Sequence, residues 1–92
     1  MKYIVSWTLP TGADYHTATE RFLKSGGMPP PGVAMLGRWH GMNRRGFAVA
    51  ESTDAKALYT WMAQWADVLD IAVTPCLEDA DAGSVLQSLR SS

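Results

Sequence analysis

The fold of this chain is decided by one stretch, which reads V-A-M-L-G-R-W-H (33–40), G-M-N-R-R (41–45) and G-F-A-V-A-E (46–51). Two apolar runs flank a short segment that contains Gly and Asn, and this arrangement is typical of a β-hairpin. The stretch also carries Arg38, Trp39 and His40 at the turn end of its first strand. We therefore expect this hairpin to form the sheet and to hold the functional side chains.

The register of the hairpin follows if Trp39 lies opposite Phe47. The other expected pairs are Met35 with Glu51, Leu36 with Ala50, Gly37 with Val49, Arg38 with Ala48, and His40 with Gly46. Successive residues of a strand point to opposite faces, so a slip of one residue would exchange the faces.

Outward from the hairpin, the pattern predicts five further elements. They are a strand over 2–9, a helix over about 14–24, a helix that begins at 53 or 54 and ends at 67–70, a strand over 71–78, and a weaker helix over 79–89. Thr11 or Asp14 is expected to cap the first helix, and Thr53 or Asp54 the second. Pro75 lacks an N–H group, which predicts that its strand lies at a sheet edge or carries a bulge.

This order is β-α-β-β-α-β with an added C-terminal helix. Two right-handed β-α-β units in one antiparallel sheet predict an α+β fold of the ferredoxin-like type, with two helices on one face. A length of 92 residues predicts a single domain over 1–92.

Alternation divides the expected sheet into two sets of residues. The bulky set, expected to pack under the helices, is Tyr3, Val5, Trp7, Val33, Met35, Trp39, Phe47, Val49, Ile71, Val73 and Leu77. The small or mildly polar set is Ile4, Ser6, Thr8, Ala34, Leu36, Arg38, His40, Ala48, Ala50, Ala72, Thr74 and Cys76. We expect the second set to line a cavity that a second subunit closes. The reverse assignment, in which the bulky face makes the dimer, is the alternative.

Composition points to a partner and to a compartment. Hydrophobic residues make up 47% of the chain and four residues are Trp, a large apolar content for a small core, so a homodimer is expected. A net charge of −1 argues against nucleic-acid binding. The N-terminal stretch is too short and too polar for a signal peptide or a membrane span. The single Cys76 forms no internal disulfide, and we expect a cytoplasmic protein.

Six residues form the predicted ligand site. Arg38 and His40 point the same way from one strand and are expected to orient an anionic group, with Trp39 as the pocket wall. Ser6 and Thr74 share the parity of Arg38 and offer hydroxyl groups. Glu51 joins the site by a salt bridge to Arg38 or Lys56, or else ends its strand in solvent.

Other chemistries fit the sequence less well. No pair of His or Cys residues has metal-ligand spacing, so neither a metal nor a cofactor is expected. Cys76 would act as a nucleophile only beside a His that lowers its pKa. The R-G-F-A run at 45–48 matches the start of an RNA-recognition signature, but Val49 and Ser52 replace the aromatic residues that would stack on bases.

Several motifs along the chain resemble one family. They are Y-I-V-S-W, E-R-F-L, G-G-x-P-P-x-G-V, L-G-R-W-H, R-G-F-A-V-A-E, A-L-Y-x-W-x-x-x-W and V-T-P-x-L-E-D. The chain resembles the domain of unknown function 3303 family, within the dimeric α/β-barrel superfamily. The resemblance implies a ferredoxin-like protomer whose sheet pairs with a second copy. Related members include cofactor-free monooxygenases, haem-degrading enzymes, chlorite dismutase relatives and stress-response barrels.

Three functions follow as hypotheses. The first is a homodimer that binds a small, partly apolar or anionic molecule on the sheet face. The second is a dimerisation or stress-response module that binds no ligand. The third is a cofactor-independent, monooxygenase-like enzyme acting on an aromatic or polyketide-like substrate. Whether the protein is an enzyme is left open by the sequence.

Overall fold

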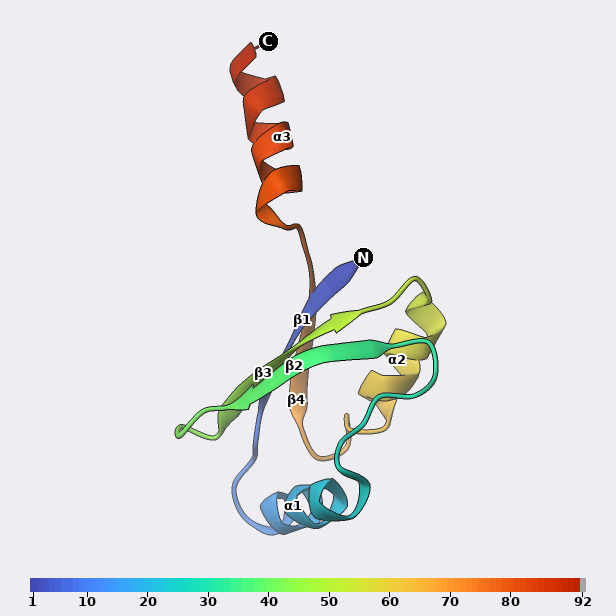
Figure 1. Ribbon diagram of the computed structural model, residues 1–92. Coiled ribbons are helices and arrows are strands. Elements are labelled where there is room, and N and C mark those ends of the chain that lie inside the picture. The colour runs from blue at the N-terminus through green and yellow to red at the C-terminus, as the bar shows by residue number, and fades with distance from the viewer. Residues whose placement is uncertain (92) are drawn as a thin grey trace.

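A computed structural model describes residues 1–91 of the chain. Its elements are β1 (Lys2–Thr8), α1 (Ala13–Ser25), β2 (Ala34–His40), β3 (Arg45–Glu51), α2 (Ala55–Ala63), β4 (Asp70–Cys76) and α3 (Asp79–Ser91). The strands form one antiparallel sheet in the order β2-β3-β1-β4 (Figure 1). The predicted ferredoxin-like α+β fold with an added C-terminal helix is confirmed. No helix within the described residues is long and apolar enough to cross a membrane.

The core lies between the sheet and α2. Val5 of β1 and two small residues of β3, Ala48 and Ala50, are buried against Leu58 and Trp61 of α2. The small side chains of β3 leave room for the indole of Trp61, and burying each large side chain here contributes about 1.5–3 kcal/mol.

Gly46 continues the run of small residues in β3. A Cβ atom at this position would collide with the ring of Trp7, which pairs with Gly46 across the sheet. Alternate small residues of β3 therefore face the large rings of the core, and this packing fixes which side of β3 is buried.

The ends of the elements follow local chemistry. The Asp54 carboxylate caps α2 by accepting hydrogen bonds from the backbone N–H groups of Lys56 at 3.0 Å and Ala57 at 3.2 Å, as predicted. The predicted side-chain cap of α1 is wrong, because Gly12 occupies that position without a side-chain hydrogen bond. Asp14 lies instead in the first turn of α1, where its charge complements the positive end of the helix dipole.

One further boundary differs from the prediction, and the predicted edge position of the last strand is confirmed. The helix α2 ends at Ala63, before the predicted 67–70, and the chain continues in turns through Val68. The strand β4 lies at one edge of the sheet. Pro75 is therefore tolerated, since an edge strand has a side that needs no hydrogen-bond donor.

The hairpin register is confirmed at the turn end and differs at the other end. Trp39 lies opposite Phe47, and the predicted partners of Gly37, Arg38 and His40 are also observed. A β-bulge between Met35 and Gly37 then shifts the strand by one residue, so Met35 lies opposite Ala50 and not opposite Glu51. The extra residue breaks the regular alternation of β2. Side chains that precede the bulge therefore lie on the opposite face from the one that alternation counted from the turn would predict.

The bulge and the packing of β3 change the predicted division of the sheet. In β1 and β4 the predicted residues face the helices, among them Val5 and Val73. In β3 the two sides are exchanged, because Ala48 and Ala50 are buried while Phe47 is exposed. Arg38 pairs with Ala48 and therefore also points toward the helices.

Candidate ligand site on the open face of the sheet

We call the side of the sheet that α1 and α2 leave uncovered the open face. Its side chains are Lys2, Ile4, Ser6 and Thr8 of β1, Ala34 and Trp39 of β2, Arg45, Phe47, Val49 and Glu51 of β3, and Asp70, Ala72, Thr74 and Cys76 of β4.

Strand register arranges the open face in rows. At the hairpin end, Arg45, Thr8 and Asp70 lie side by side on three neighbouring strands. At the opposite end lies a second polar row, which consists of Glu51, Lys2 and Cys76. The open face is thus charged at both ends, and most of its apolar residues lie between them.

The middle of the open face exposes large apolar side chains. Trp39 is 54% exposed, Phe47 46% and Ile4 41%. The rings of Trp39 and Phe47 stack at a centroid distance of 5.4 Å. A contiguous apolar surface of this kind marks an interaction site on many soluble proteins.

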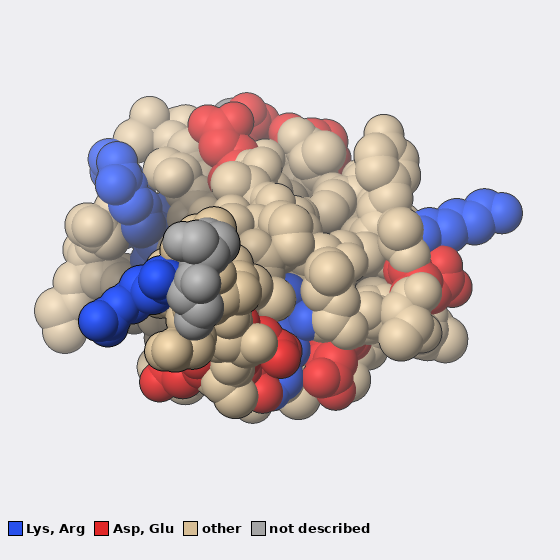
Figure 2. Space-filling model, turned by 90° about the horizontal axis from the view of Figure 1, so that it is seen from above, with Lys and Arg blue, Asp and Glu red and all other residues tan. Residues whose placement is uncertain are grey.

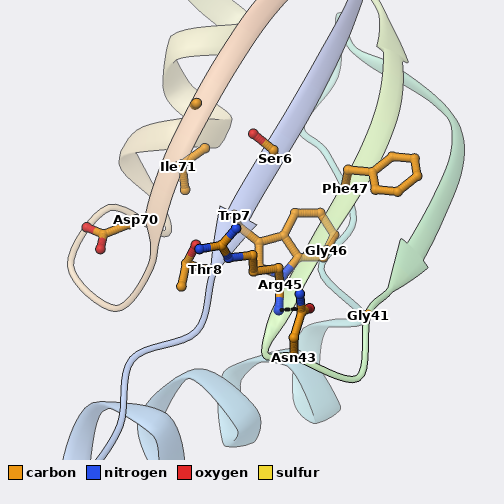
Figure 3. Close-up of a pocket in the computed structure, with 11 residues that line it drawn as sticks. Ser6, Trp7, Thr8, Gly41, Asn43, Arg45, Gly46, Phe47, Asp70 and Ile71 are labelled. Atoms are coloured by element: carbon orange, nitrogen blue, oxygen red, sulfur yellow. Dashed lines mark hydrogen bonds between the residues drawn. The ribbon is translucent and has the colours of Figure 1, made fainter.

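A hollow of about 570 Å³ opens at the hairpin end of this face. Figure 3 shows Phe47, Ser6 and Thr8 along it, with Arg45 and Asn43 at the turn. The amide oxygen of Asn43 accepts a hydrogen bond of 3.3 Å from the backbone N–H of Arg45. Its lining therefore combines an aromatic ring, hydroxyl groups and a cationic side chain.

Two opposite charges flank this hollow. Arg45 and Asp70 lie on either side of Thr8 in the same row. Within residues 1–91 neither side chain forms an ion pair, since the ion pairs found there are Lys2–Glu78 and Arg21–Asp67. The guanidinium of Arg45 is thus available to bind an anionic group.

Arg38 lies under the helices and not on the open face where the sequence analysis expected it. Its guanidinium donates hydrogen bonds to the carbonyl oxygens of Gly26 at 2.7 Å and Gly27 at 2.8 Å. These carbonyls follow the last turn of α1, whose negative end a cation stabilises. Burial lowers the pKa of Arg38 from its ordinary value, yet the side chain remains charged near neutral pH.

Gly27 must be glycine for this contact to form. Its φ is +60°, and a Cβ atom would lie 2.7 Å from the Nη1 atom of Arg38. The guanidinium also lies over the ring of Phe22, 4.9 Å from its centroid. These contacts lock Arg38 to the end of α1.

His40 also points away from the predicted site. Its ring meets Trp7 and Phe22 edge-on, at centroid distances of 5.7 and 5.4 Å. Arg38 and His40 border a cavity of about 60 Å³ between the sheet and the helices, which has room for little more than water. The prediction that both residues share a face with Ser6 and Thr74 is therefore wrong.

The other four predicted residues do lie on the open face, but not together. Ser6 lines the hollow, and Trp39 lies beside it. Thr74 lies in the next row, and Glu51 lies at the far end of β3. The predicted salt bridge of Glu51 to Arg38 or Lys56 does not form among the described residues.

The residues of the hollow that the sequence analysis missed are Thr8, Asn43, Arg45, Phe47 and Asp70. Asn43 belongs to the turn, and Arg45 and Asp70 are the first residues of β3 and β4. The side on which Arg45 and Phe47 lie follows only once β3 is placed correctly. The small residues at 46, 48 and 50 carry the signal, because large rings of the core can approach β3 only on its small side.

Some further groups carry no site. Cys76 is a half-buried free thiol in the row opposite to the hollow. Within residues 1–91 no three His, Cys, Asp or Glu side chains gather closely enough to hold a metal ion. On the face shown in Figure 2, basic side chains stand apart from one another among acidic and uncharged ones.

The fold and this site define the class of the protein, a small ferredoxin-like α+β protein with one uncovered sheet face. The chain belongs to the family described as Domain of unknown function (DUF3303), which matches residues 1–90. The comparisons find no matching curated protein and no matching solved structure.

Proposed function

We propose that this protein is a homodimer that binds a small, partly apolar anion in the hollow of its open face. The observation that carries the proposal is the continuity of that face, where exposed apolar rings lead into a hollow with a free guanidinium. Two open faces that meet would enclose a space between two sheets, as in the dimeric α/β-barrel proteins that the sequence resembles.

Support for the dimer comes from the exposed rings. Trp39 and Phe47 leave about half of their surfaces uncovered, and large aromatic side chains are enriched at the centres of protein interfaces. A second copy supplies a matching surface of the same kind, since a two-fold axis pairs one patch with itself.

Support for the ligand comes from the size and chemistry of the hollow. Its volume of about 570 Å³ falls in the range of about 300–1,000 Å³ that small-molecule sites occupy. Phe47 offers a ring for an aromatic group, Arg45 a bidentate partner for a carboxylate, and Ser6 and Thr8 hydroxyl groups. We therefore infer an aromatic carboxylic acid as the ligand class.

We place the protein in the cytoplasm, because its single cysteine is a free thiol and reducing compartments keep thiols in that state. Two alternatives stay open within the same fold. A dimerisation or stress-response module would use the open face without binding a ligand, and a cofactor-independent monooxygenase-like enzyme would transform a molecule held in the hollow.

Thermal unfolding with a panel of aromatic acids, including benzoate and salicylate, tests the ligand site. An acid at ten times its Kd stabilises the folded state by about 1.4 kcal/mol, which raises the Tm of a domain of this size by roughly 5–10 °C. We expect Arg45→Gln to remove the shift.

Lys56→Gln is the control, because it also removes one positive charge and Lys56 lies on α2, where it does not line the hollow. It should keep the full shift. Equal shifts in both variants, or a panel in which no acid raises the Tm, would contradict the proposed ligand site, and the second result would favour the ligand-free module.

A further inference from the structure

The helix α3 extends beyond the sheet, away from α1 and α2 (Figure 1). Its apolar side chains recur at helical spacing, and three of them are largely exposed, Val85 at 52%, Leu86 at 62% and Leu89 at 67%. Leu77, in the connection between β4 and α3, is 59% exposed. One side of α3 is thus apolar and faces water in a single copy of the chain.

A helix of this kind needs a partner surface. Helices of up to about 12–15 residues are marginal in water when nothing packs against them, and α3 has 13 residues. Gly83 in its interior costs about 1 kcal/mol relative to Ala. Because helical stability in proteins comes mainly from packing of an apolar side, we expect the apolar side of α3 to be covered.

Area indicates that a second copy is the cover. Four strands of seven residues give the open face a flat area of roughly 450 Å². A helix of 13 residues has a footprint of roughly 200 Å². If each copy gives one α3 and receives one, the flat contact area per copy rises to about 850 Å², which leaves ample room for the roughly 800 Å² of accessible surface that each partner of a stable interface buries.

The base of α3 is continuous with the open face. Lys2 of the open face pairs with Glu78, which directly precedes α3. A shallow hollow lined by Lys2, Glu51 and Asp81 connects the sheet to the first turn of the helix. A partner that covers the open face therefore also meets the start of α3.

The distribution of charge favours one relative orientation of the two copies. The start of α3 is acidic, with Asp79 and Asp81 in its first turn after Glu78, and acidic side chains gather around the projecting helix in Figure 2. The opposite end of the sheet carries Arg44 and Arg45. Lys2 at the α3 end and Asp70 at the hairpin end each offset one charge. The α3 end stays acidic on balance and the hairpin end basic, so a partner turned end for end matches them.

We propose that α3 is an arm exchanged between two copies of this chain. The open faces meet about a two-fold axis that runs across the strands, and Val85 and Leu86 pack on the partner. Asp79 and Asp81 then approach the hairpin of the partner at Arg44, beside its ligand hollow, and Arg45 stays directed to the ligand. This inference rests on the proposed dimer through the open face.

Sedimentation equilibrium of full-length variants tests the apolar contact. Val85→Glu combined with Leu86→Glu should weaken dimerisation at least tenfold. The control, Ala80→Glu combined with Ser84→Glu, adds the same charge to the opposite side of α3 and should change the dimer Kd by less than twofold.

A charge exchange tests the end-for-end arrangement. Arg44→Glu in one chain, and Asp79→Lys with Asp81→Lys in another, should each weaken the homodimer at least tenfold. An equimolar mixture should form heterodimers, because both contacts between the two chains become attractive again.

The outcomes separate this inference from the proposed function. A chain that dimerises equally well with Val85→Glu and Leu86→Glu, but not with Phe47→Glu, overturns the exchanged arm and leaves the open-face dimer intact. A mixture without heterodimers also overturns it. A wild-type chain that is monomeric at every concentration overturns both.

Discussion

The two faces of the sheet differ in how their residues alternate in size. The covered face sets small residues of β3, Ala48 and Ala50, against the large ring of Trp61 and is closed within one chain. The open face sets Phe47 beside Trp39, ring on ring, and leaves both rings exposed. Size complementarity within the chain marks the core, and uncovered rings mark the surface where a partner is expected.

The same hairpin supplies an arginine to each face. Arg38 is fixed by two carbonyl groups at the end of α1, so its charge stabilises the fold. Arg45 lines the hollow of the open face and forms no ion pair among residues 1–91. Two predictions test whether this division between structural and functional residues is real, and a third tests an ion pair outside the two faces.

The largest effect is expected from the tryptophans. Trp61→Ala should lower the free energy of unfolding by about 3–5 kcal/mol, because it leaves a cavity in the core. Trp39→Ala removes mainly the stack on Phe47 and should cost about 0.5–1.5 kcal/mol. Urea unfolding of both variants at a protein concentration that keeps the chain monomeric measures the difference, and equal losses would contradict the division.

A smaller effect is expected from the arginines. Arg38→Gln should cost about 2 kcal/mol, since hydrogen bonds of a charged group contribute about 1.5–3 kcal/mol when partly buried. Arg45→Gln should change stability by less than about 0.5 kcal/mol, as surface substitutions usually do. The same unfolding experiment decides, and a larger loss for Arg45→Gln would show that its guanidinium supports the fold.

The smallest effect is expected from the ion pair that joins α1 to the segment after α2. The guanidinium of Arg21 contacts the Asp67 carboxylate at 2.8 and 2.9 Å and holds the pKa of Asp67 below its usual value. Because the folded-state pKa is depressed, this stabilisation is present above about pH 4 and is lost as the pH falls further.

Thermal unfolding of Asp67→Asn from pH 7 to pH 2 measures this pair. The variant should be slightly less stable than the wild type at pH 7, and the gap should close at low pH. Arg21→Gln should show the same gap, with little further loss in the double variant. A gap that does not change with pH would mean that the pair contributes no charge interaction to stability.

The sequence predicts the fold well because its strongest signals are local. The turn at 41–45 aligns Trp39 with Phe47, Asp54 caps α2, and Pro75 places β4 at an edge. Each of these signals acts through the backbone within a few residues, so no knowledge of tertiary packing is needed to interpret it.

The site is predicted less well because it depends on which side of each strand is buried. The bulge after Met35 leaves no clear mark in the sequence, and it changes the face of every residue on one side of it relative to the other. The phase of β3 depends on Trp7 and Trp61, which come from distant segments. Only Ser6 of the predicted set therefore lines the hollow.

The central claim is that the open face is covered by a second copy, and sedimentation velocity tests it most directly. At micromolar concentrations the wild-type chain should sediment at twice its mass of 10.0 kDa. Phe47→Glu should sediment as a folded monomer, because Phe47 is 46% exposed in one copy. A wild-type chain that remains a 10.0 kDa monomer across the concentration range would contradict the account.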